Sequence, residues 1–161
     1  MADTDFFKYG AKWLRADFHL HTQADKEFKY SGELGAFFPE YIQRLKDEAI
    51  NLGVITNHNK FDLEEFKTLK KQASKEGIWL LPGVELSVND GGNGIHCLIV
   101  FDYDSWYQNN TNYIDQFLVA AFEGIPNREN ENTRCKYSLK DVLEKLQEHR
   151  NSKRNSFIVM A

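Results

Sequence analysis

The sequence predicts an α/β fold in which strands and helices alternate along a mainly parallel sheet. Short apolar segments rich in β-branched residues alternate with longer amphipathic segments, and 42% of the 161 residues are hydrophobic, which is enough for the core of one domain. We expect strands at residues 14–20, 53–57, 78–88, 95–101 and 156–161, and helices at residues 39–52, 62–77, 112–123 and 138–150.

Residues at the expected helix ends support these boundaries. Pro39 suits the first turn of the first helix, and Gly53 suits the position just after its last turn. Asp62 is a typical N-cap for the second helix, which Gly77 would end. Ser138 can cap the last helix, whose apolar residues fall on one face. The local signals therefore agree with the alternation of strands and helices.

Composition and charge give no sign of a nucleic-acid-binding, disulfide-rich, secreted or membrane-spanning protein. The net charge of −4 and the pI of about 5.7 give no overall electrostatic footprint for nucleic acid, although a local basic groove is compatible with them. Cys97 and Cys135 are far apart and form neither a disulfide framework nor a zinc motif. The sequence shows neither a signal peptide nor an apolar run of the ~18 residues that a membrane span needs. We therefore expect a cytoplasmic protein with no membrane partner, and an N-terminal arm at residues 1–12.

The segment ADFHLHT (residues 16–22) holds two of the five histidines. Side chains at alternate positions of a strand point to the same face, so Asp17, His19 and His21 are expected to point the same way. A pair of imidazoles on one strand face can hold a single metal ion with two nitrogens. The segment is therefore a candidate metal site.

Three further residues of metal-binding type follow at the ends of other strands. His58 comes just after the second strand, Glu85 lies late in the third, and His96 opens the fourth. Parallel α/β sheets build their sites where the strands end. His149 lies outside this pattern, at the end of a helix, where an imidazolium would be favourable.

The residue types predict the chemistry. Imidazole and carboxylate ligands suit Zn, Mn or Fe. A lone strand histidine is usually packed or solvated, but Glu85 sits in the apolar segment LLPGVELSV and must be paired, protonated or bound to metal. Two ions about 3.5–4 Å apart can clamp a phosphate and deprotonate a water for in-line attack. Together these residues favour a site for two or three divalent ions.

Four segments resemble, in order and spacing, the opening motifs of the PHP family, the polymerase and histidinol phosphatase domains. They are DFHLHT, GVITNHNKFD, LPGVELSV and GIHCLIVFD. The resemblance runs from about residue 13 to 101 and returns with SFIVMA at residues 156–161. Members of this family are metal-dependent phosphoesterases. The lead-in GAKWLRADFHLHT is also similar to PHP domains that are fused to large ATPase modules.

The resemblance implies a distorted seven-stranded (β/α) barrel of the TIM type, with residues 1–161 as its N-terminal portion. It implies that His19 and His21 hold one metal and that Glu85 bridges two. It further implies that His96 holds the second metal and His58 a third. Glu85 and His58 are also the candidate catalytic residues.

Five other residues are candidates for supporting roles. Asp25 is the nearest match to an acid that the family often has after the His-x-His pair, with a spacing about one residue short. Asn57 stands where the family usually has Asp, and we expect Asn57 and Asp17 to orient ligands without binding metal. Lys60 and Arg15 are candidate contacts for a substrate phosphate, and a solvated surface position is the simpler interpretation of each.

The function that these observations predict is hydrolysis of a phosphate ester in a small molecule, a nucleotide or a nucleic acid. Two alternatives stay open: an amidohydrolase-like enzyme, and a non-catalytic PHP module of a larger protein, fused to or partnered with an ATPase. The family places a later His and an Asp-x-His pair beyond the last motif found here. We therefore expect residues 1–161 to carry an unfinished site with little activity of its own, and an open sheet edge that pairs with itself or lowers solubility.

Overall fold

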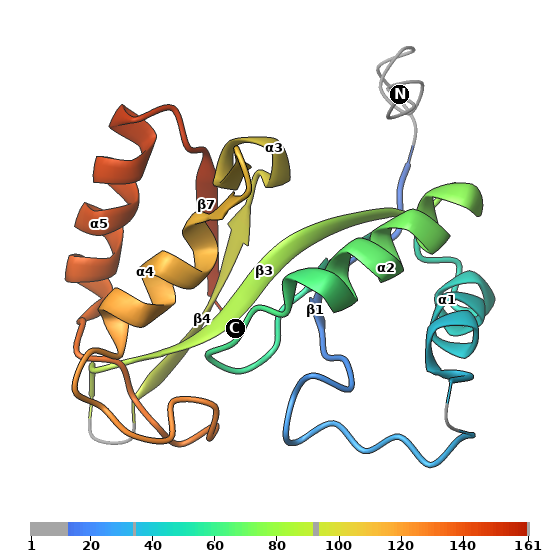
Figure 1. The fold of residues 1–161 in the computed structure, drawn as a ribbon, viewed down its shortest axis with the longest axis horizontal. Coiled ribbons are helices and arrows are strands. Elements are labelled where there is room, and N and C mark those ends of the chain that lie inside the picture. Colours follow the sequence, from blue (N-terminus) through green and yellow to red (C-terminus); the bar gives the residue numbers. More distant parts are fainter. Residues whose placement is uncertain (1–12, 34, 92–93, 161) are drawn as a thin grey trace.

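The computed structural model describes residues 13–33, 35–91 and 94–160, so the N-terminal arm expected at residues 1–12 lies outside the described residues. Its strands are β1 (Ala16–Leu20), β2 (Leu52–Ile55), β3 (Trp79–Val88), β4 (Ile95–Phe101), β5 (Tyr107–Gln108), β6 (Thr111–Asn112) and β7 (Ser156–Met160). Its helices are α1 (Phe37–Asp47), α2 (Leu63–Lys75), α3 (Tyr103–Trp106), α4 (Tyr113–Ala121) and α5 (Leu139–Asn151) (Figure 1). The short elements α3, β5 and β6 are absent from the sequence prediction.

Five strands form one curled sheet in the order β1-β2-β3-β4-β7. β1, β2 and β3 are parallel, whereas β4 is antiparallel to both of its neighbours, β3 and β7. The predicted seven-stranded (β/α) barrel is therefore wrong: the described residues form an open, mixed half-barrel. The physical reason is the connection between β3 and β4, because residues 89–94 are too few for the crossover that parallel pairing requires.

The sheet is curved enough to bring side chains of its two edge strands together. Phe18 of β1 and Phe157 of β7 lie with ring centroids 6.3 Å apart although three strands separate them in the sheet. The main core lies on the other face, where Leu69 of α2 and Leu118 of α4 are fully buried. In Figure 1, α1 and α2 lie beside the parallel half of the sheet, and α4 and α5 beside the antiparallel half.

Helix ends follow the predicted caps with one exception. Asp62 accepts a hydrogen bond from the backbone of the first turn of α2, and Ser138 forms a capping box on α5. The first helix ends at Asp47 rather than near residue 52, because Ala49 leaves the helix with a φ of 55°. Gly53 consequently lies in β2, where a Cβ would come within 2.7 Å of the Leu20 side chain.

Two residues that the sequence singled out are structural. Cys97 is fully buried in β4, and burial raises the pKa of its thiol to about 12, so it is not poised as a nucleophile. His149 is not the helix-end cation that the sequence predicts. Burial and the neighbouring Arg154 lower the pKa of His149, its ring packs 4.5 Å from Trp106, and its Nδ1 accepts a hydrogen bond from Arg154 at 2.9 Å.

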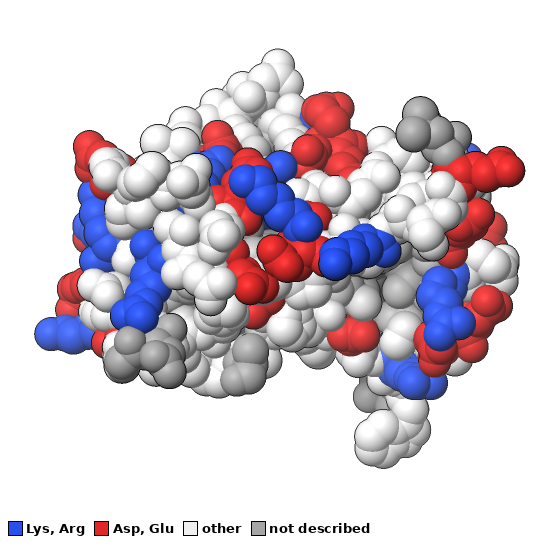
Figure 2. Space-filling model, turned by 90° about the horizontal axis from the view of Figure 1, so that it is seen from below, with Lys and Arg blue, Asp and Glu red and all other residues white. Residues whose placement is uncertain are grey.

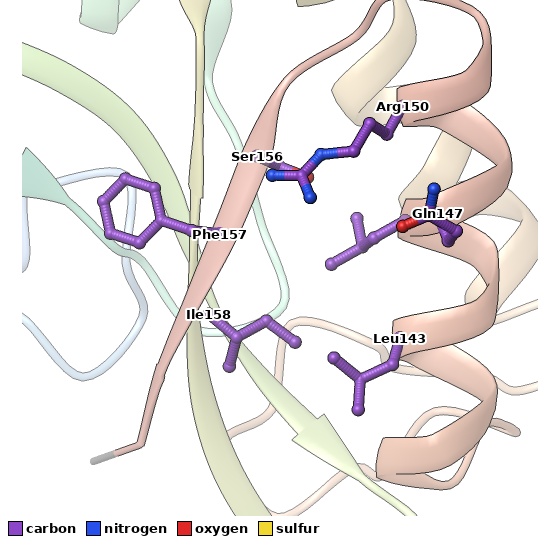
Figure 3. Close-up of a pocket in the computed structure, with 7 residues that line it drawn as sticks. Leu143, Gln147, Arg150, Ser156, Phe157 and Ile158 are labelled. Atoms are coloured by element: carbon purple, nitrogen blue, oxygen red, sulfur yellow. The ribbon is translucent and has the colours of Figure 1, made fainter.

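β7 forms one edge of the sheet. Residues of β7 and α5 line a pocket between these two elements. Figure 3 shows Ile158 pointing from β7 toward α5, and Phe157 pointing to the opposite face of the strand. Phe157 and Met160 are about half exposed, at 48% and 54%. Pairing across this edge stays a prediction.

None of the helices within the described ranges is long and apolar enough to cross a membrane.

Candidate metal centre

The six predicted metal ligands lie together near the ends of β1 and β2, beside the later part of β3 and the start of β4. They fall into groups of three, and within each group one nitrogen or oxygen atom of every residue lies within 4.8 Å of those of the other two. The ligands come from these elements: His19 from β1, His21 and Asp25 from the loop after it, His58 from the bridge after β2, Glu85 from β3 and His96 from β4.

The antiparallel direction of β4 explains why His96 reaches this site. His96 is the second residue of its strand and pairs with Ser87 of β3. In a parallel strand the same residue would lie at the opposite edge of the sheet. Here its Nδ1 lies 2.6 Å from Oε1 of Glu85. The antiparallel direction of β4 therefore places His96 beside the other predicted ligands, whereas the expected parallel sheet would not.

Glu85 is the centre of the cluster. Its side chain is 5% exposed. Its carboxylate lies 2.7 Å from His19 Nε2, 3.3 Å from His21 Nε2, 3.1 Å from His58 Nε2 and 2.6 Å from His96 Nδ1. Burial opposes ionisation of Glu85, but hydrogen bonds from the histidines outweigh it and lower the pKa of the carboxyl. Glu85 is thus a buried carboxylate that contacts all four site histidines.

Asp25 is a second buried carboxylate, at 1% side-chain exposure. One of its oxygens, Oδ2, accepts from the His58 backbone N–H at 2.7 Å, and the other accepts from the Glu27 N–H at 2.9 Å. The same Oδ2 lies 2.7 Å from His21 Nδ1 and 3.0 Å from His58 Nδ1. Burial opposes ionisation, but these hydrogen bonds lower the pKa of Asp25. The short spacing after the His-x-His pair therefore does not keep Asp25 from the site.

The donors form three overlapping groups, and each pair of groups shares one residue. The groups are His19–His21–Glu85, His21–Asp25–His58 and His58–Glu85–His96. Zn–N and Zn–O bonds of about 2.0–2.2 Å place two ligands of one ion roughly 3–3.5 Å apart. The nitrogen–oxygen distances of 2.6–3.3 Å around Glu85 are close to that spacing. The donor set therefore could hold divalent ions, with its atoms at or just below the spacing of ligands on one ion.

The protonation of the histidines is a second test of this fit. His21 and His58 each face a carboxylate oxygen with both ring nitrogens. Hydrogen bonding alone satisfies both contacts only when each ring carries two protons, because a neutral imidazole has a lone pair on one nitrogen. Burial lowers the pKa of His21, but hydrogen bonds to Glu85 and Asp25 outweigh this and raise it. Divalent cations would satisfy the same lone pairs and carboxylates without the extra protons.

Asn57 supports the loop after β1 rather than the His58 ring. Its Oδ1 accepts from the Thr22 N–H at 2.8 Å, and its Nδ2 donates to the Thr22 hydroxyl at 2.8 Å. Thr22 Oγ1 in turn donates to Glu65 of α2. The expected role of Asn57 in orienting His58 is therefore corrected: its side chain fixes the residue next to His21. The sequence carried no signal for Thr22 or Glu65, because both lie among other polar residues.

Replacing Asn57 with Asp tests this network, because Asp is the residue usual in the resembling family. The change removes the donor to Thr22 and places a carboxylate near the partly buried Glu65. We expect the metal-free protein to lose about 1–3 kcal/mol of stability, the cost of a broken buried hydrogen bond. Urea unfolding measures this, with the exposed Asn109→Asp as the matched control. An Asn57→Asp variant as stable as the parent would show that the amide donor is unimportant.

The other three predicted residues differ in their placement. Asp17 Oδ1 accepts from the His19 backbone N–H at 2.9 Å, so it supports β1. It does not share the ligand groups, because the register of β1 shifts between Asp17 and Leu20 and breaks the alternation. Arg15 precedes β1, at the end of the strand away from the site, with its guanidinium 3.9 Å from Glu48. The structure therefore does not bring Arg15 to the ligand cluster, and its phosphate contact stays a prediction. Lys60 lies two residues after His58.

The chain was compared with protein families and with curated proteins. It matches no family model, and no curated protein matches it significantly.

Proposed function

We propose that this protein is a metal-dependent hydrolase of phosphate esters related to the PHP phosphoesterases, with two or three Zn, Mn or Fe ions as cofactors. The observation that carries the proposal is Glu85, a buried carboxylate shared by two of the three donor groups. A shared carboxylate is the feature that places two cations close enough to act on one phosphate. The sequence motifs that surround the ligands support the choice of a phosphate ester as substrate.

The predicted ligands on one side of the site are exposed to solvent, and those on the other side are buried. The side chains of His19 and His96 are 42% and 36% exposed, whereas Glu85 and Asp25 are buried. A substrate would therefore approach over His19 and His96. Bound divalent ions would supply the polarisation of the phosphoryl group and the acidification of water. Asp25 and Asn57 would keep the histidines and the loop after β1 in place during the reaction.

Glu85 and His58 remain the candidate catalytic residues. His58 is 13% exposed, and its Nε2 lies 3.1 Å from Glu85 Oε2. Its backbone N–H and its Nδ1 are both held by Asp25, which fixes the ring in one orientation. A fixed imidazole at the inner side of the site can hold or accept a proton next to the reacting phosphate. A cytoplasmic location and an ATPase partner remain predictions from the sequence.

The proposal is tested with a panel of substrates. The chain and any longer natural protein that contains it are assayed with para-nitrophenyl phosphate, a phosphodiester, a dinucleotide and an oligonucleotide, each with added Mn or Zn. We expect hydrolysis of at least one phosphate ester, loss on chelation and recovery when metal is restored. Hydrolysis of amide substrates alone would favour the amidohydrolase alternative. Absence of hydrolysis in both proteins at full metal loading would contradict the proposal.

A further inference from the structure

Three charged side chains meet at the rim of the candidate metal centre. Lys26 directly follows Asp25, and Lys60 comes two residues after His58, so each lysine lies on a loop that supplies metal ligands. Glu129 comes from the long connection between α4 and α5. Figure 2, which shows the molecule from below the view of Figure 1, has Lys and Arg side chains directly beside Asp and Glu side chains near the middle of the face.

Glu129 lies between the two lysines. Its Oε1 is 3.4 Å from Lys60 Nζ, and its Oε2 is 3.7 Å from Lys26 Nζ. The side chains of Lys26, Lys60 and Glu129 are 56%, 26% and 33% exposed. Ion pairs of this length and exposure are weak and are readily exchanged for another anion. One carboxylate also leaves the pair of ammonium groups with an unbalanced positive charge.

The backbone around Glu129 is held independently of these ion pairs. Asn59 donates from Nδ2 to the Thr133 carbonyl at 2.9 Å, and Ser87 donates from Oγ to the Glu131 carbonyl at 3.0 Å. A turn at residues 127–130 is closed by a backbone hydrogen bond of 3.0 Å. Glu129 can therefore leave the lysines by rotation of its side chain, while the loop stays in place.

We propose that Lys26 and Lys60 form an anion subsite for a phosphate group of the ligand, and that Glu129 occupies this subsite until a phosphate replaces it. The link to catalysis rests on the proposed function, since a phosphate held here would lie next to the loops that carry His21, Asp25 and His58. A phosphate dianion matches two ammonium groups in charge, whereas the Glu129 carboxylate carries only one negative charge. Glu129 thus selects for doubly charged groups and against singly charged ones.

Direct binding of inorganic phosphate to the metal-free chain tests the proposal. The titration is followed by two-dimensional amide NMR at low ionic strength, which reports the dissociation constant and the residues affected. We expect Glu129→Gln to tighten phosphate binding by about threefold to tenfold, because the competing carboxylate is gone. The shifts should centre on Lys26 and Lys60, and adding Lys60→Ala to the Glu129→Gln variant should remove the gain.

Glu131→Gln is the matched control, because Glu131 lies in the same loop and its side chain accepts a hydrogen bond from Asn132. If Glu131→Gln tightens phosphate binding as much as Glu129→Gln does, the change in net charge alone explains the effect. That result would overturn the proposal. If Glu129→Gln does not tighten phosphate binding, whether or not its stability falls, Glu129 does not compete with phosphate. That result would also overturn the proposal. Failure of the proposed function would appear separately, as absence of hydrolysis while the phosphate effect persists.

Discussion

Glu85→Gln is expected to abolish tight binding of divalent metal ions. Gln keeps the size of the side chain but removes the negative charge that contacts all four site histidines. Loss of a partner outside the ligand set costs about 10–100-fold in metal affinity, so loss of a ligand shared by two donor groups should exceed about 100-fold. Competition titration with a chromophoric chelator measures the affinity.

The exposed Glu123→Gln is the matched control for this change, because Glu123 pairs with Lys136 on the surface. It should bind metal as the parent does. Circular dichroism should show that Glu85→Gln keeps its fold, since Gln can still accept hydrogen bonds from the imidazoles. Unchanged metal affinity in a folded Glu85→Gln variant would mean that Glu85 is not a ligand.

Asp25→Asn is expected to destabilise the metal-free protein by about 2–4 kcal/mol. The two carboxylate oxygens of Asp25 accept from two different backbone N–H groups, those of His58 and Glu27. An Asn side chain has only one acceptor oxygen, so in either orientation its NH₂ group faces an N–H donor. Urea unfolding in the presence of a chelator measures the change. The same variant should bind fewer ions, because the group of His21, Asp25 and His58 loses its carboxylate.

Asp47→Asn is the control for this prediction, because Asp47 is an exposed acid that accepts a hydrogen bond from Gln43 within α1. Its stability should change by less than about 0.5 kcal/mol. Equal stability of Asp25→Asn and the parent would show that the two backbone hydrogen bonds do not depend on the carboxylate.

Most of the ligand set was predictable, because the chemistry of its residues conflicts with their surroundings. Glu85 lies in an apolar strand, and His19 and His21 share a short strand and its end. Strand ends gather at one edge of a sheet, so these residues could be grouped without a structure. The curl of the sheet and the direction of β4 depend on how strands pair, and that information is spread over the whole chain. The five strands of the main sheet were therefore predictable from local patterns, whereas the antiparallel direction of β4 and the open, curled form of the sheet were not.

The residues around the ligands were harder to place because their partners are distant in sequence. Asn57 contacts Thr22, which lies 35 residues earlier, and Asn59 contacts Thr133, which lies 74 residues later. Asp17 was assigned to the ligand face by strict alternation, which the irregular register of β1 interrupts. Local periodicity contains no information about such contacts.

The central claim is that the cluster around Glu85 binds divalent metal, and elemental analysis of the reconstituted protein tests it most directly. After incubation with Zn or Mn and removal of free ions, we expect at least one equivalent per chain, with a clear loss in the double variant His19→Ala, His21→Ala, in which two of the three donor groups lose ligands. Retention of less than about a tenth of an equivalent of Zn, Mn, Fe or Ni by the parent chain would contradict the claim.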